Sequence, residues 1–294
     1  MPGINKMHSL ENSKATLAHE SAPYFSESGQ AWLDDALQVL TASSQIIEDL
    51  GLYSAMAKRK LGVESLQQAA VIDTGFAPLD VHHWSSAEAA RLILLMTAIE
   101  CDPAQAEDII TAYYRMGDES EHMALLRGLI LFAPAEFLSV IALDAGRSNN
   151  LEVLAALTLD NPYPGCLFNE AQFNQMVLKA LFLGLAIERK EGLAKRANTD
   201  LARMGENYVV EREEAGRSVP VDIWLAIGPC ASEKGRQQMI DYLGHEEVVH
   251  RYYCSLSLIR RLPQDPAILP ILRQQLDTEQ ETLILELLQD TFET

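Results

Sequence analysis

The stretch SSAEAARLILLMTAIECDP, residues 85–103, decides the fold of this chain. Ser85 and Glu88 have the spacing of a capping box, in which each side chain accepts a hydrogen bond from the other residue's backbone at a helix start. Residues 89–99 are apolar except for Arg91 and Thr97. A helix that is apolar on nearly all sides is covered by other elements. We therefore predict a buried helix here.

The same helix signals recur along the rest of the chain. The predicted helix starts between residues 85 and 150 lie about 15–18 residues apart, an interval that fits a helix of ordinary length and a short loop. Short connections place consecutive helices side by side and antiparallel. The starts that we predict are at Ser85, Asp102, Asp118, Pro134, Asn149 or Asn150, Asn169 or Glu170, Asn198 or Thr199, Pro220, Ser232, Glu246, Pro266 and Thr278.

Strand signals are scarce, and only Ala70-Val71-Ile72 is typical of a short extended segment. We therefore predict an all-α protein of stacked antiparallel helix pairs, an irregular α-solenoid or HEAT-like αα superhelix. Residues 1–30 are rich in polar residues, which predicts a disordered or loosely ordered N-terminal segment. Residues 31–294 are predicted to form a single all-helical domain.

The charge balance limits the partners of this chain. Its 23 Lys and Arg residues against 42 Asp and Glu residues give a net charge of −19, which repels phosphate backbones and anionic lipid headgroups. The apolar run at 89–99 is shorter than the roughly 20 residues that a membrane span needs. Four widely spaced cysteines suit reduced thiols. We expect a cytoplasmic protein without a nucleic-acid partner or direct membrane insertion.

Two Glu-x-x-His pairs raise the possibility of a metal-dependent enzyme. Glu119 with His122, and Glu247 with His250, have the spacing that di-iron helical bundles use twice. Glu119 however lies in the first turn of a predicted helix, where carboxylates are common without a metal. We keep a di-iron or similar enzyme as an alternative and expect no metal and no cofactor.

Two further histidine groups contain side chains that can bind a metal. His245 and His250 resemble the zinc-protease motif, but that motif needs two histidines four residues apart on one helical face, and these lie five apart. His82-His83 precede the predicted helix start at Ser85. They could bind a metal, although a loop that packs Trp84 against the core is the expected role of this segment.

A small-molecule site is predicted near residues 160–220. The segment Asn161-Pro162-Tyr163-Pro164 is expected to be rigid and extended, because residues before proline avoid the helical region. It precedes a predicted helix with one apolar stripe. Amide and charged side chains beside such a stripe can orient a small ligand. The candidate ligand-binding residues are Tyr163, Asn174, Gln175, Lys179 and Arg212, and the alternative is that the amides satisfy backbone groups.

Several segments of the chain resemble the EboA family over about residues 30–290. They are GDESE at 117–121, LLRGL at 125–129, DAGRSN at 144–149, NPYP at 161–164, FNQMVLKA at 173–180, ER at 211–212 and AGRSVP at 215–220. The resemblance implies a gene cluster that also encodes a prenyltransferase-like membrane protein, a TatD-like hydrolase and sugar-isomerase-like proteins, and that moves secondary-metabolite precursors. It supplies no catalytic residues.

These observations favour a non-catalytic accessory protein of a secondary-metabolite cluster. Its partner would be a small metabolite or a protein encoded in the same cluster. Two alternatives remain at this point: the metal-dependent helical enzyme, and a pure protein–protein scaffold, which would have a broad groove or apolar patch in place of an enclosed polar pocket.

Overall fold

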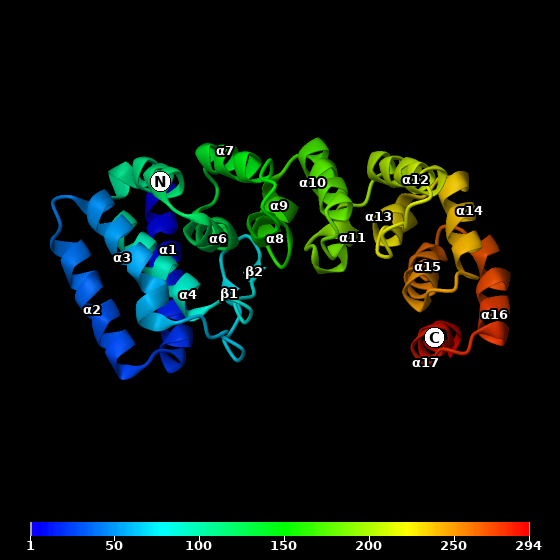
Figure 1. Ribbon diagram of the computed structural model, residues 1–294, viewed down its shortest axis with the longest axis horizontal. Helices are drawn as coiled ribbons and strands as arrows, with labels where there is room; N and C mark the ends of the chain where they lie inside the picture. Colours follow the sequence, from blue (N-terminus) through cyan, green and yellow to red (C-terminus); the bar gives the residue numbers. More distant parts are fainter. Residues whose placement is uncertain (1, 294) are drawn as a thin grey trace. The chain divides into compact units, whose positions relative to one another are not determined.

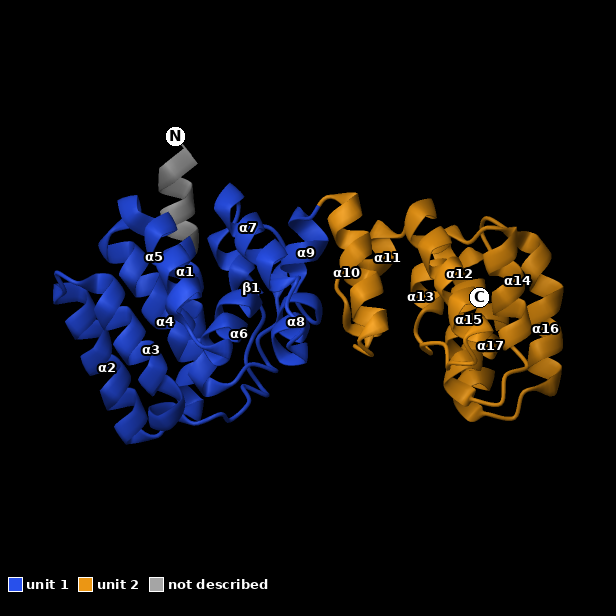
Figure 2. Cartoon of the chain, turned by 45° about the horizontal axis from the view of Figure 1, so that its top comes forward, with its two compact units in different colours: residues 1–168 blue, residues 169–294 orange. Residues whose placement is uncertain are grey.

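A computed structural model describes the backbone of residues 2–293 and the side chains of residues 10–293 (Figure 1). The described chain is all-α, as predicted, with helices α1–α17 and one two-stranded ladder. It divides into two compact units, unit 1 over Met1–Phe168 and unit 2 over Asn169–Thr294 (Figure 2). The predictions of a single domain over 31–294 and of an irregular solenoid of stacked helix pairs stay predictions.

Unit 1 contains nine α-helices, three 3-10 helices and both strands within its described part. In chain order they are α1 (Pro2–Ser21), η1 (Ala22–Tyr24), α2 (Glu27–Ala42), α3 (Ile46–Leu61), β1 (Ile72–Asp73), β2 (Pro78–Leu79), α4 (Ser86–Cys101), η2 (Pro103–Gln105), α5 (Ala106–Met116), α6 (Glu119–Arg127), η3 (Leu129–Phe132), α7 (Glu136–Ala145), α8 (Leu151–Thr158) and α9 (Pro162–Leu167).

Helix α4 is the centre of unit 1. Ser85 and Glu88 form the predicted capping box, and every residue from Ser86 to Ile99 is buried. Helices α1, α2, α3 and α6 all pack against it, as the surroundings of α4 in Figure 1 show. The buried helix predicted from the sequence is therefore confirmed.

The N-terminal segment differs from the disorder predicted for residues 1–30. Helix α1 packs against α4, and Ser13, Leu17 and Ser21, spaced one helical turn apart, are buried there. Lys14 on α1 pairs with Glu100 on α4. Because most residues of the segment are polar, its composition does not indicate this one buried stripe. Met1 and the side chains up to residue 9 lie outside the described residues.

The two strands form a short antiparallel ladder in which Ile72 pairs with Leu79. The Ile72 end of the predicted extended segment is therefore a strand. Between β2 and α4 the chain passes through His82-His83 and places Trp84 in the core, with none of its surface exposed. The expected packing role of Trp84 is confirmed.

Unit 2 is helical throughout its described part. Its elements are α10 (Glu170–Phe182), η4 (Ile187–Arg189), α11 (Leu193–Arg196), α12 (Thr199–Glu214), α13 (Trp224–Ile227), η5 (Gly228–Cys230), α14 (Glu233–Tyr242), α15 (Val248–Arg261), η6 (Pro266–Ile268), α16 (Leu269–Thr278) and α17 (Thr282–Glu293). Helix α15 contacts α13, α14, α16 and α17, and α12 contacts α10, α13 and α14.

The segment that begins at Asn161 is helical, so the prediction of a rigid extended segment was wrong. Proline fits the first helical turn, which lacks backbone partners in any case. The Asn161 side chain accepts a hydrogen bond from Tyr163 N and donates to Leu126 O and Ala156 O. This buried amide starts α9 and ties it to two neighbouring segments.

Several predicted helix starts are displaced. Capping side chains are observed at Asp118 and Ser232, as predicted, and at the first or second of the two predicted positions for the other three helices, namely Asn150, Asn169 and Asn198. The proline-based starts are less accurate, because proline fixes one backbone angle but supplies no capping acceptor. Pro103 and Pro266 open 3-10 helices, and the α-helices expected at Pro134, Pro220, Glu246 and Thr278 begin two to four residues later. Among the described helices, none combines the length and apolar character needed to cross a bilayer.

Candidate functional site

A polar pocket of about 730 Å³ lies in unit 1, and we call it the Arg91 pocket. Its volume is in the range of small-ligand sites, about 300–1,000 Å³. Helices α3, α4, α6 and α8 and the segments beside them line it. The lining residues are Ala55, Lys58, Val63, Ser85, Ala87, Glu88, Arg91, Asp118, Glu119, Ser120, Met123, Arg127 and Glu152.

Arg91 is the most buried charged group of this pocket, with 3% of its surface exposed. Its Nε donates to Ser54 O at 3.2 Å, and one terminal nitrogen donates to Ser120 O at 3.4 Å. Its remaining N–H groups have no hydrogen-bond partner among the described side chains and backbone. A buried guanidinium with unused donors is suited to bind an oxyanion.

A second guanidinium reaches the same pocket. Arg127 Nε lies 2.9 Å from Glu88 Oε1, and both side chains are mostly buried. The contact is too bent for a hydrogen bond, so charge attraction holds the pair. Glu88 Oε2 meanwhile accepts from the backbone and hydroxyl of Ser85. The capping box of α4 therefore positions Glu88, and Glu88 positions Arg127.

The carboxylates of Asp118, Glu119 and Glu152 and the ammonium group of Lys58 complete the charged lining of the Arg91 pocket. Asp118 and Glu121 form a capping box at the start of α6. Burial favours a higher pKa for Asp118, but hydrogen bonds from Ser120 and from the Glu121 backbone, together with the charge of Arg91, lower its pKa overall. The pocket can thus hold a polar molecule by contacts of both signs.

Neither Arg91 nor Arg127 was predicted from the sequence as a site residue. The signal was present in the quoted stretch, because Arg91 is a charged residue within an apolar run, and charged side chains are rarely buried without a partner. What the sequence does not show is that Arg127, on another helix, reaches the same pocket.

The predicted ligand-binding residues are divided between the two units. Tyr163 belongs to α9 of unit 1, where it is 1% exposed and its hydroxyl lies 3.5 Å from Ser139 Oγ. The other four residues belong to unit 2.

Asn174 is buried in an amide pair. Asn174 Nδ2 donates to Asn198 Oδ1, and Asn198 Nδ2 donates to Asn174 Oδ1, each at 3.0 Å. Asn198 Oδ1 also accepts from Leu201 N and so caps α12. Asn174 therefore links α10 to the start of α12.

Lys179 lines a groove of about 560 Å³ between α10 and α12, which we call the Lys179 groove. Burial lowers the pKa of Lys179. Gln175 is exposed and does not belong to the groove lining. The lining residues are Leu178, Lys179, Phe182, Met204, Asn207, Tyr208 and Glu211.

Arg212 lies next to this groove. Its guanidinium is 5.9 Å from the ring centre of Tyr208, and its Nε donates to Ser218 O at 2.8 Å. The hydrogen-bond partner of this guanidinium is thus a backbone carbonyl. Arg212 thereby ties the turn after α12 to the helix.

The residues of the metal alternative lie in different units. His122 in unit 1 donates from Nε2 to Tyr114 O at 2.7 Å and lies against the Tyr114 ring. Glu119 lines the Arg91 pocket. His250 and Glu247 are in unit 2, close to His245.

His245, Glu247 and His250 each place one ligand atom within 4.8 Å of the others. The five-residue spacing of His245 and His250 was interpreted as if both lay on one helix. In the structure α15 begins only at Val248, so His245 precedes the helix. Hydrogen bonds nevertheless occupy the imidazole lone pairs. His250 Nδ1 accepts from Trp224 Nε1 at 2.9 Å, and His245 Nδ1 accepts from Glu247 N at 3.1 Å.

The protonation of His250 follows from these contacts. Because Nδ1 accepts a hydrogen bond, the proton of the neutral ring is on Nε2, which lies 3.8 Å from Glu247 Oε2. Burial lowers the pKa of His250, His245 lowers it further, and Glu247 and the Val219 carbonyl oppose this only in part. His250 is therefore a neutral, hydrogen-bonded core residue.

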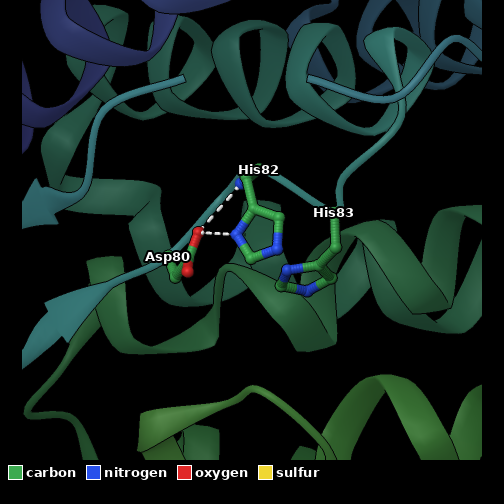
Figure 3. A group of neighbouring side chains, drawn as sticks. All are labelled: Asp80, His82 and His83. Carbon is green, nitrogen blue, oxygen red and sulfur yellow. Dashed lines mark hydrogen bonds and ion pairs between the residues drawn. The ribbon is translucent and has the colours of Figure 1, made fainter. Parts of the chain in front are cut away.

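A third histidine group lies in the loop between β2 and α4 (Figure 3). Asp80 Oδ1 accepts hydrogen bonds from the backbone N–H of His82 at 3.0 Å and from its ring Nδ1. The ring of His83 lies edge to face with that of His82 at 5.4 Å between centres. Burial lowers the pKa of His83 to about 4, and the charge of Arg127 contributes to this shift.

The match to a family model connects this geometry to known proteins. The model described as metabolite traffic protein EboA matches residues 17–228, which is most of the chain. The chain belongs to the EboA family. The matched part of this EboA-family protein includes the Arg91 pocket, the Lys179 groove and the β2–α4 loop. Neither a curated protein nor a solved structure matches the chain.

Proposed function

We propose that this EboA-family protein is a non-catalytic cytoplasmic accessory protein that binds a small polar metabolite of a secondary-metabolite pathway in the Arg91 pocket. The observation that carries the proposal is the pair of guanidinium groups, Arg91 and Arg127, whose terminal donors are not fully used by the described residues. The family description as a metabolite traffic protein supports a binding role.

The ligand class follows from the chemistry of the lining. Two guanidinium groups and Lys58 suit a carboxylate or a phosphate, which arginine binds with paired N–H donors. Glu119, Asp118 and Glu152 would repel a second anionic group but accept hydrogen bonds from hydroxyl or ammonium groups. We therefore propose a ligand with one oxyanion and additional hydroxyl or amino groups.

Purely structural roles explain only part of this arrangement. The two carbonyl bonds of Arg91 connect α4 to α3 and to α6, which stabilises the unit. Burying a charge costs several kcal/mol in real proteins unless its partners compensate. Two neutral carbonyls and the nearby charge of Asp118 compensate the guanidinium, but they leave some of its N–H donors without an acceptor, and a bound oxyanion would supply one.

The test is a thermal-shift screen of purified protein against hydroxylated carboxylates, amino acids and sugar phosphates, each paired with its uncharged amide or unphosphorylated analogue. We expect at least one anionic member to raise the melting temperature and its uncharged analogue to fail. The hit is then titrated against Arg127→Gln. A lost charge-assisted hydrogen bond is worth about 1.5–3 kcal/mol, or about ten- to a hundredfold in Kd.

The matched control for this titration is Lys179→Gln in the Lys179 groove. This variant removes a positive charge from the Lys179 groove, and we expect it to leave the Kd of the ligand unchanged. Equal binding by Arg127→Gln and wild type would contradict the assignment to the Arg91 pocket. Weakening by Lys179→Gln alone would place the ligand in the Lys179 groove, as the sequence analysis proposed.

The Lys179 groove is kept as a second candidate because residues 173–180, one of the segments that resemble the EboA family, lie on helix α10, which lines the groove. A failure of every ligand in the screen would favour the scaffold alternative, in which the partner is a protein of the same gene cluster. Co-purification with the proteins of that cluster would test this alternative.

A further inference from the structure

We propose that Asp80, His82 and His83 form a binding site for a divalent transition-metal ion of the zinc class, at the loop between β2 and α4. One ligand atom from each residue lies within 4.8 Å of the other two. Figure 3 shows the carboxylate and both imidazole rings gathered in this loop. The proposal is independent of the Arg91 pocket and goes beyond the expectation of no metal drawn from the sequence.

His82 is prepared as a ligand by Asp80. Because its Nδ1–H donates to the carboxylate, the lone pair of the neutral ring is on Nε2. In Figure 3 the dashed line joins Asp80 to one ring nitrogen, and the other ring nitrogen is on the side of His83. A carboxylate that holds the far nitrogen of a metal-binding histidine is a recurrent arrangement in zinc sites. Asp80 can also bind the ion directly after this hydrogen bond opens.

His83 supplies the independent observation. Both of its ring nitrogens are buried, and neither has a hydrogen-bond partner among the described residues. Leaving a buried polar atom without a partner costs about 1–3 kcal/mol. A bound ion would satisfy one of the two nitrogens, and such unexplained buried atoms are where an ion or ordered water is expected.

The surrounding charges permit a cation here. Arg127 exerts the largest charge effect on His83 and is positive, whereas Asp160 and Asp80 act on it as negative charges. The two carboxylates offset the guanidinium in part.

The donor set and its exposure indicate the kind of ion. Two imidazole nitrogens with a carboxylate favour Zn²⁺ and its neighbours over Mg²⁺ or Ca²⁺, which prefer oxygen ligands. The side chain of His82 is 54% exposed, so solvent can supply the remaining ligands.

The experiment is a calorimetric titration in which ZnCl₂ is added to the protein. The protein used carries no histidine tag and has first been treated with a chelator to remove bound metal. We expect one Zn²⁺ per chain for wild type. His82→Ala and His83→Asn should each weaken binding by at least about tenfold, and Asp80→Asn by about 10- to 100-fold. Circular dichroism of each variant establishes that it is folded.

The matched control is His245→Asn, which alters the other histidine cluster. The lone pairs of that cluster are already used, so zinc binding should not change. The exposed position of His82 makes His82→Ala the decisive variant even if His83→Asn does not fold. Absence of zinc binding by wild type, or binding that His82→Ala leaves unchanged, would overturn the proposal.

Discussion

At the scale of single residues, Arg91 makes contacts that the residues around it in the sequence do not indicate. It interrupts an apolar helix, is 97% buried, and connects α4 to Ser54 on α3 and to Ser120 on α6. The sequence identifies it as an unusual residue. Its partners, however, come from positions far along the chain, and local patterns do not identify such contacts.

A prediction at this scale concerns Asn174. Replacing it with alanine removes both part-buried hydrogen bonds between the two amides, although Asn198 keeps its bonds to Arg196 O and Leu201 N. We expect Asn174→Ala to lower the free energy of unfolding by about 1–3 kcal/mol, measured by urea denaturation. Gln175→Ala, one residue along on the exposed face, should change it by less than about 0.5 kcal/mol. Equal stability of the two variants would contradict the structural role of the amide pair.

The histidines show how far residue patterns carry a site prediction. The Glu-x-x-His spacing brings His250 close to Glu247, as the sequence suggested. The pattern gives no information on Trp224, which occupies the imidazole lone pair from a distant position in the chain. Hydrogen-bond partners decide whether a histidine is a ligand, and they require the folded structure.

At the scale of elements, the turn between α16 and α17 depends on one ion pair. Glu279, the residue after α16, accepts bidentate hydrogen bonds from Arg251 on α15 at 3.0 and 2.9 Å. The same carboxylate accepts from the backbone N–H groups of Gln280 and Glu281. The side chain of Glu279 is 3% exposed, so the pair is shielded from solvent.

The pH dependence of this turn can be predicted with its sign. Hydrogen bonds from Arg251 lower the pKa of Glu279 from 4.5 to about 2, against the effect of burial. The ionised form therefore stabilises the folded state. That contribution is complete above pH 4.5 and is lost as the pH falls toward 2. We expect an NMR titration of the Glu279 carboxyl to show a midpoint near 2 in wild type.

The Arg251→Met variant supplies the comparison for this titration. It should raise the Glu279 midpoint and increase amide hydrogen exchange in α16 and α17, because a buried carboxylate without its partner is destabilising by about 3–5 kcal/mol. An unchanged midpoint in the variant would contradict the assigned cause of the shift.

The packing of α4 against the end of α6 gives another prediction. A Cβ atom at Gly128 would lie 2.5 Å from Leu92 Cδ1, and Leu92 is buried. We expect Gly128→Ala to cost about 1–3 kcal/mol in the free energy of unfolding. The control is Gly51→Ala within α3, where the added atom meets open space and should stabilise the helix by about 0.5–1 kcal/mol. Denaturant titration of both variants tests the close approach, and equal effects would contradict it.

Element prediction succeeded where the determining contacts are local. The capping boxes at Ser85 and Asp118 involve residues three apart, so the sequence pattern contains both partners. The start of helix α9 was mispredicted in part because it is stabilised by a contact from Asn161 to Leu126 O on α6, which lies 35 residues earlier in the chain. Helix α1 was missed because its order depends on packing against α4.

At the scale of the whole molecule, the family match crosses the boundary between the two compact units at Phe168 and Asn169. Under the prediction of one domain over residues 31–294, which stays a prediction, the two units would unfold together. We therefore expect a single cooperative unfolding transition in differential scanning calorimetry, with equal calorimetric and van't Hoff enthalpies. Two resolved transitions would contradict the single-domain prediction.

The central claim is that the chain binds a small oxyanionic metabolite in the Arg91 pocket and leaves it chemically unchanged. Equilibrium dialysis of the best ligand from the thermal-shift screen, followed by mass spectrometry of the recovered ligand, tests this most directly. The account predicts one ligand per chain, recovered intact, with the affinity reduced at least about tenfold in Arg127→Gln. A converted ligand, or affinity unaffected by Arg127→Gln, would contradict it.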